Sequence, residues 1–92
     1  MKSKNSYASV WDALEDDPIK IENLKMRSEL MIAINNKIVK DKLNQSEAAK
    51  RLAISQPRVS ALSQGKIDVF RLDTLVNFSH RLGMHVSIKI AA

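Results

Sequence analysis

Two glutamines and an arginine lie close together in the segment SQPRVSALSQ, residues 55–64. If this segment is a helix, Val59 and Leu62 fall on one side and the polar residues on the other. Glutamine and arginine can each form paired hydrogen bonds with the edge of a DNA base. The spacing therefore favours a helix whose outward side enters a DNA groove; the alternative is an ordinary helical hairpin with a solvated polar surface. The outward side carries Gln56, Pro57, Arg58, Ser60, Ala61 and Gln64.

Residues suited to catalysis or metal binding are sparse. The chain has no cysteine, which excludes disulfide scaffolds and thiolate zinc sites. Its two histidines, His80 and His85, have no carboxylate cluster near them, and the acidic pair Asp16–Asp17 is typical of a solvated surface. We predict that the chain is not an enzyme and needs no metal and no cofactor.

Charge divides the chain into two parts. Residues 1–22 carry a net charge of −2, whereas residues 23–92 carry 12 basic and five acidic side chains, a net charge of +7. A basic body favours a polyanion such as DNA, although an ordinary solvated surface explains the charge equally well. DNA would repel the acidic part, so we expect a different partner for it.

The length of 92 residues allows one small domain. No apolar run is long enough to span a membrane, and residues 1–17 lack the apolar core of a signal peptide. We therefore expect a cytoplasmic protein, associated with the nucleoid.

The predicted helix at residues 55–64 must be positioned by neighbouring helices. A long helix is predicted from about residue 21, because apolar residues recur at helical spacing up to residue 38. A short helix is predicted over about 45–52, where Asn44 and Glu47 have the spacing of a capping box. The next helix begins after the cap Ser55, and Pro57 falls in its first turn, where a missing backbone N–H removes no hydrogen bond.

The chain end has two further predicted elements. A fourth helix is expected over about 72–82, and the strict alternation in MHVSIKI predicts a strand from residue 84. A lone strand leaves its backbone unpaired, so we expect it to pair with the same strand of a second copy, or else to dock on its own helices. The predicted dimerisation residues are Met84, Val86, Ile88 and Ile90.

The segment LNQSEAAKRLAISQPRVSALSQGKI, residues 43–67, resembles the helix-turn-helix of the XRE (Cro/repressor-like) family. ENLKMRSELMIAI before it and FRLDTLVNFSHRLGMHVSIKI after it resemble the XRE-type antitoxins of the HigA kind. The resemblance covers about residues 10–90. Two positions depart from the family pattern: Ala53 stands where glycine is usual, and Arg71 stands where Ser or Thr commonly caps the fourth helix.

The resemblance implies a fold and an order of domains. The fold is mainly α, a lambda-repressor-like domain of four to five helices with a C-terminal β-strand for dimerisation. Residues 1–20 are expected to be an acidic, flexible or partly helical segment, residues 21–83 the DNA-binding domain with its motif at 45–65, and residues 84–92 the dimerisation strand.

The resemblance also assigns contacts to DNA. Gln45 would contact the phosphate backbone, while Arg58 would reach either a base or a phosphate. Lys50, Arg51 and Lys66 either contact phosphates or are merely solvated. The predicted DNA-binding residues are Gln45, Lys50, Ser55, Gln56, Pro57, Arg58, Ser60, Ala61, Gln64 and Lys66.

A protein partner follows from the same resemblance: a RelE/HigB-like ribonuclease toxin, together with repression of the chain's own operon. Val10, Trp11 and Leu14 share one side of the acidic segment and are the predicted toxin-binding residues. The alternative for Trp11 is that it folds back onto the domain's own core. The alternative function is a free-standing Cro-like repressor with no toxin. A module that binds only proteins fits the basic body less well.

Overall fold

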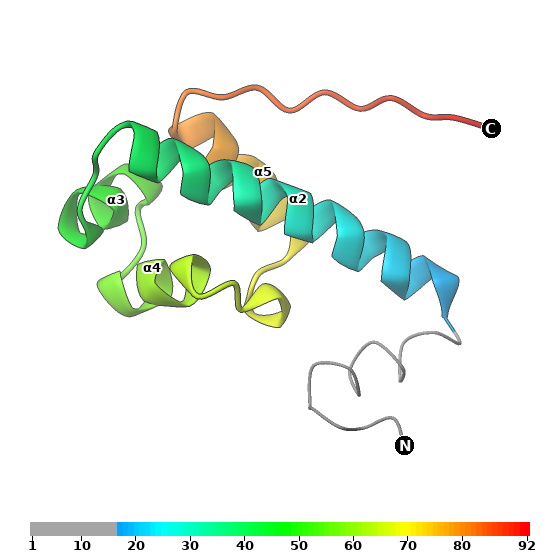
Figure 1. Cartoon of the computed structure of the whole chain (residues 1–92), viewed down its shortest axis with the longest axis horizontal. Coiled ribbons are helices and arrows are strands. Elements are labelled where there is room, and N and C mark those ends of the chain that lie inside the picture. Colours follow the sequence, from blue (N-terminus) through cyan, green and yellow to red (C-terminus); the bar gives the residue numbers. More distant parts are fainter. Residues whose placement is uncertain (1–16) are drawn as a thin grey trace, which may run out of the picture.

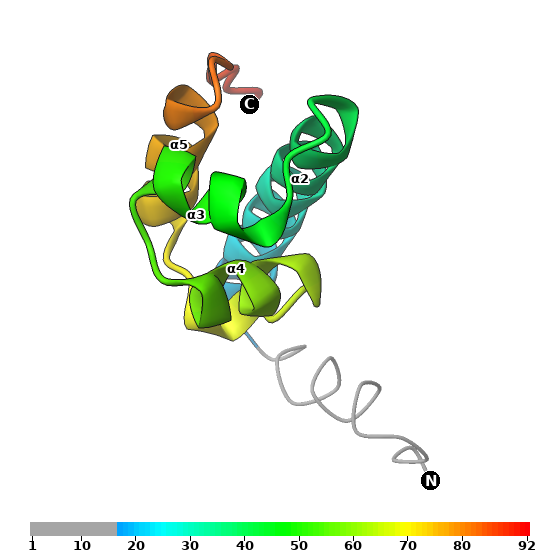
Figure 2. The same ribbon diagram turned by 90° about the vertical axis from the view of Figure 1, so that its left-hand side faces the viewer.

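The computed structural model describes residues 17–92, and the longest helix in this part of the chain is α2 (Pro18–Lys40) (Figure 1). The elements that follow are α3 (Gln45–Leu52), α4 (Gln56–Ser63), the 3-10 turn η2 (Ile67–Val69) and α5 (Leu72–Arg81). Helices α4 and α5 and the turn η2 contact α2, while α3 packs against α4 and α5 (Figure 2). None of these helices is both long and apolar enough to cross a bilayer.

Helix α2 begins at Pro18, three residues earlier than the predicted residue 21. The reason is local. Asp17 precedes a proline and has a non-helical backbone (φ −129°, ψ 89°), which is what an N-cap residue requires. Its carboxylate accepts hydrogen bonds from the backbone N–H groups of Ile19 (3.1 Å) and Lys20 (3.3 Å). Asp17 therefore starts α2 as its N-cap.

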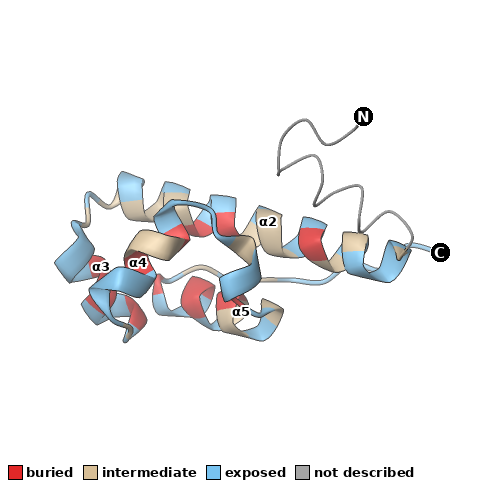
Figure 3. Ribbon diagram, turned by 90° about the horizontal axis from the view of Figure 1, so that it is seen from below, coloured by how far each residue is buried: buried red, intermediate tan, exposed pale blue. Residues whose placement is uncertain are grey.

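The main core lies between α2 and the other helices, and Figure 3 shows buried residues along the inner side of α2. Phe70 and Phe78 pack edge to face, with ring centroids 5.9 Å apart, an arrangement that adds to the energy of burial alone. The only buried polar residue among those described, Ser79, donates its hydroxyl to the carbonyl of Leu75 at 3.1 Å. The core residues are Met31, Ile34, Leu52, Leu62, Phe70, Leu75, Phe78 and Leu82.

A second, smaller cluster joins α3 to α4. Ala48 and Ala49 pack there against Val59, and their small side chains let the two helices cross closely. The capping box at the start of α3 is confirmed: the Asn44 side chain accepts from the Glu47 N–H at 2.8 Å, and the Glu47 carboxylate accepts from the Asn44 N–H at 2.9 Å. The predicted bounds of α3, 45–52, are also confirmed.

The strand predicted from residue 84 is not formed, and no strand occurs within residues 17–92. Residues 84–92 instead run as an extended segment beyond α5 (Figure 1). The Met84 N–H donates to the carbonyl of Ser79 at 2.9 Å, and Met84 packs against the main core. A strand needs a second backbone to pair with, and the described part of one chain offers none.

Two turns of the motif have a left-handed backbone. Ala53 (φ 60°, ψ 45°) ends α3, and Gly65 (φ 74°) follows α4. A side chain at such a position is strained by its Cβ, whereas glycine is not. Ala53 therefore stores strain at the position where the XRE pattern has glycine.

We predict that Ala53→Gly raises the free energy of unfolding by about 0.5–1 kcal/mol, because relief of strain exceeds the entropy that glycine adds to the unfolded chain. Gly65→Ala should lower it by about 1 kcal/mol. A Cβ at residue 65 meets no atom within 4 Å, so only backbone strain is involved. Urea unfolding of both variants checks the opposite signs. Destabilisation by Ala53→Gly would contradict the strain argument.

Candidate nucleic-acid interface

Helix α4 starts as the sequence predicts. Ser55 is its N-cap, with an extended backbone, and the Ser55 hydroxyl accepts from the N–H of Arg58 at 3.4 Å. Pro57 lies in the first turn, where N–H groups have no partner inside the helix. The proline therefore helps to begin the helix and fixes the direction in which its first turn points.

The two sides of α4 differ as expected. Val59 and Leu62 are buried, whereas the opposite side is exposed or half-buried and polar. Ala61 is half-buried and packs against the main core, so it is less accessible than its neighbours. The exposed residues are Ser55, Gln56, Pro57, Arg58, Ser63 and Gln64, and Ser60 is half-buried.

The remaining predicted DNA-binding residues lie on neighbouring elements. Gln45 is the first residue of α3, where an exposed helix N-terminus has free N–H groups and a partial positive charge that favour a phosphate. Lys50 is exposed near the end of α3, and Lys66 is exposed in the turn after α4. Because α3 packs on α4, and Lys66 lies two residues after the C-cap of α4, both lysines belong to segments adjacent to this helix.

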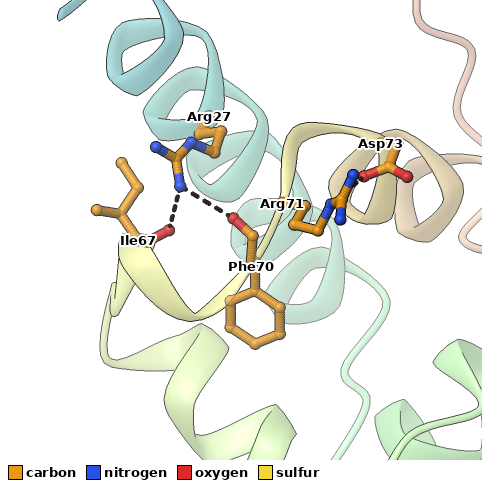
Figure 4. Close-up of polar contacts among 5 residues, drawn as sticks. All are labelled: Arg27, Ile67, Phe70, Arg71 and Asp73. Atoms are coloured by element: carbon orange, nitrogen blue, oxygen red, sulfur yellow. Dashed lines mark hydrogen bonds and ion pairs between the residues drawn. The ribbon is translucent and has the colours of Figure 1, made fainter. Parts of the chain in front are cut away.

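Two polar residues of α2 hold α4 and the turn after it, and sequence analysis missed both. The Asn35 side chain donates to the carbonyl of Leu62, near the end of α4, at 3.0 Å. The Arg27 guanidinium donates to the carbonyls of Ile67 (3.1 Å) and Phe70 (3.2 Å), as Figure 4 shows. A partial signal was present in the sequence: each residue lies four positions from the predicted core residue Met31, which places it on the inward side of the helix but does not identify its partner.

A shallow pocket lies beside Arg27 at the start of α5. Arg71, the N-cap of α5, makes no side-chain cap and instead pairs with Asp73 at 3.4 Å (Figure 4). Both side chains of this ion pair are more than two-thirds exposed, so its contribution to stability is small. The pocket has a volume of about 520 Å³ and is lined by Asn23, Arg27, Arg71, Leu72 and Asp73.

The structure does not place the other predicted site residues on α4 or the elements beside it. Val10, Trp11 and Leu14 lie outside the described residues. Ile88 and Ile90 are 84% and 89% exposed, while Met84 and Val86 are half-buried. The rings of His80 and His85 stack edge to face at 5.8 Å. Within residues 17–92, no three His, Cys, Asp or Glu side chains gather as a metal site requires.

Known proteins share this arrangement. Residues 13–91 match the model of a helix-turn-helix domain family. The chain is also similar to a solved structure assigned to the XRE family of transcriptional regulators. The two are 34% identical, the alignment covers 79% of this chain and 82% of that one, and the TM-score is 0.75. No curated protein matches the sequence.

We predict that Asn35→Ala lowers the free energy of unfolding by about 1 kcal/mol relative to Asn36→Ala, because the Asn35 side chain donates from α2 to the Leu62 carbonyl. The same carbonyl also accepts from the Gly65 N–H at 3.1 Å, so the variant loses one hydrogen bond to this carbonyl and keeps another. Asn36 is the matched control: it is exposed on the same helix, so both variants gain the same helix propensity. Thermal or urea unfolding measures the difference. Equal stability of the two variants would contradict this prediction and would show that the bond from the Gly65 N–H is sufficient for the Leu62 carbonyl.

Proposed function

Because the chain belongs to the XRE family of helix-turn-helix transcriptional regulators, we propose that it binds operator DNA as a homodimer, represses its own operon and neutralises a ribonuclease toxin. The observation that carries DNA binding is helix α4. Its back is buried, its first turn is capped and its outward side presents the exposed polar residues Gln56, Arg58 and Gln64.

In this proposal α4 lies in the major groove with its N-terminal turn toward the bases. Gln56 reads an adenine or another base edge by paired hydrogen bonds. Gln45 and the start of α3 contact a phosphate, and Lys66 contributes charge. The phosphate contacts set the register on the duplex, while the contacts from α4 determine sequence preference.

The proposed dimer uses the exposed end of the chain. Ile88 and Ile90 present apolar side chains to solvent, and the backbone beyond Met84 has no partner within the described residues. The same segment of a second copy could pair with it, antiparallel across a two-fold axis. This pairing would give the backbone groups hydrogen-bond partners and would cover the isoleucine side chains. A two-fold dimer places its recognition helices on two half-sites of an inverted repeat about 34 Å apart.

The proposed toxin contact uses the acidic start of the chain. An RNA-binding toxin must itself be basic, so a segment with excess acidic residues would attract it and be repelled by DNA. Trp11 would be the anchor of this contact, with Leu14 beside it. The proposed toxin-binding segment and the proposed DNA-binding surface then differ in charge and lie in different parts of the sequence.

A second candidate is a regulator without a toxin. The similar solved structure is assigned to the XRE family of transcriptional regulators, and regulation alone is sufficient for that assignment. An adjacent reading frame for a small basic ribonuclease, and its co-purification with this chain, would separate the two functions.

The first prediction from the proposed function compares a base contact with a phosphate contact. Gln56→Ala should weaken binding by about 1–3 kcal/mol at one base pair of the preferred site and relax preference there. Lys66→Ala should weaken all duplexes alike and reduce the salt slope by about one unit. Fluorescence anisotropy with the chain's own promoter and a scrambled duplex measures both. A wild-type chain without preference for its promoter would refute the proposal.

The second prediction concerns the dimer. Replacing Ile88 and Ile90 together by serine should produce a monomer in sedimentation equilibrium and weaken operator binding, because each subunit then holds only one half-site. This change leaves Met84 on the core. Lys89→Ser, on the alternate side of the same segment, should remain dimeric. If the double variant is an unchanged dimer, the interface lies elsewhere.

The third prediction concerns the toxin. Trp11→Ala should abolish rescue of growth from the co-expressed toxin, because a buried tryptophan anchor is commonly worth 2 kcal/mol or more. Operator binding by the same variant in a gel shift should be unchanged. Tyr7→Ala truncates another aromatic side chain of the same segment and should rescue normally. Full rescue by Trp11→Ala would place the toxin on another surface.

A further inference from the structure

The turn between α4 and α5 is held from α2 by one side chain. Arg27 donates from a single guanidinium nitrogen to the carbonyls at both ends of this turn, Ile67 (3.1 Å) and Phe70 (3.2 Å). Bonds from a charged donor are stronger than neutral ones. Ile67 is the first residue of η2 and Phe70 follows its last residue, so the two bonds hold both ends of the turn against α2.

The far side of the same turn carries an arginine of the recognition helix. The Phe70 ring points away from Arg27 (Figure 4). The Arg58 guanidinium lies over this ring, with its central carbon 4.9 Å from the ring centroid. Phe70 is 1% exposed, so the ring is itself fixed by the core, and Phe78 packs against it. Arg58 remains exposed although it is stacked.

We propose that Arg27 is a positioning residue for DNA recognition: it holds the turn whose Phe70 ring orients the Arg58 guanidinium for a base contact. This inference rests on the proposed function and adds a residue that touches no DNA. It also assigns Arg58 to a base rather than to a phosphate.

The assignment follows from what stacking does to an arginine. A guanidinium lying on a ring keeps its face covered while its N–H edge stays free, and a paired contact with guanine uses that edge. Stacking also restricts the Arg58 side chain to fewer rotamers in the free protein, so less conformational entropy is lost when DNA binds. A phosphate contact is less demanding in direction, and exposed lysines provide it elsewhere on the surface.

The first measurement needs no DNA. The Phe70 ring shifts the NMR resonances of the Arg58 side chain upfield when the two are stacked. In Arg27→Met, which keeps the volume but removes the donors, this shift should diminish. In Lys25→Met, which removes an exposed cation of the same helix, the shift should persist. An unchanged shift in folded Arg27→Met would overturn the positioning role.

The second measurement is a double-mutant cycle on binding, with a duplex that the wild-type chain selects from a random library. Arg58→Met should reduce discrimination at one G·C pair by roughly 5- to 150-fold. Arg27→Met should reduce discrimination at the same pair and not at the others. The double variant with Arg27→Met and Arg58→Met should show no greater loss of discrimination at this pair than Arg58→Met alone. Lys25→Met should leave discrimination at every pair unchanged.

Three outcomes would overturn the inference about recognition. Arg27→Met could lower the affinity for all duplexes equally, its loss of discrimination could add to that of Arg58→Met in the double variant, or the two variants could lose discrimination at different base pairs. Equal loss from Arg58→Met with a smaller salt slope would mean a phosphate contact. If Arg27→Met is too unstable, Arg27→Lys keeps the charge but not the geometry of two bonds from one planar group, and it should show the same pattern more weakly. If the wild-type chain selects no sequence, the proposed function fails, while the NMR measurement still decides whether Arg27 positions Arg58.

Discussion

An eight-residue helix does not persist in water by itself, and this constraint governs the recognition surface. Helix α4 has just eight residues, and its outward side must stay free for a partner. Its stability therefore comes from its ends and its back. Ser55 caps the first turn, Val59 and Leu62 bury the back, and the Leu62 carbonyl accepts from Asn35 of α2. Helix α2 thus stabilises α4, which is too short to be stable in isolation.

Helix α2 also contains a half-buried side chain whose hydrogen bonding is incomplete. Arg27 is half-buried, and its Nε has no hydrogen-bond partner within the described chain. Leaving a buried donor unpaired costs about 1–3 kcal/mol. An apolar side chain would avoid that cost, but it would also leave the Ile67 and Phe70 carbonyls without the donor that Arg27 supplies. What an apolar residue cannot do is hold two carbonyls at fixed distances. The arginine is better explained by the geometry of the turn after α4 than by the free energy of the fold.

Local patterns predicted the fold well, and contacts between distant segments did not. The bounds of α3 and the role of Pro57 follow from caps within a few residues, so the sequence alone was enough. Asn35 and Arg27 act across 27 or more residues, and their partners are backbone carbonyls, which no sequence pattern distinguishes. The predicted strand is wrong within the described chain for a related reason: alternation at Met84–Ile90 indicates an extended segment, but a strand needs a partner that one chain does not contain.

The polar contacts on α4 indicate which end of the helix meets the bases. In its second half the side chains are bonded to the helix itself: Gln64 donates to the Ser60 hydroxyl at 3.1 Å, and Ser63 donates to the Ser60 carbonyl at 2.9 Å. A base contact there would first have to break the bond between Gln64 and Ser60. At the first turn, the Gln56 side chain has no hydrogen bond to residues 17–92, and Arg58 is stacked with its edge free. Recognition at the N-terminal turn therefore loses fewer bonds than recognition farther along.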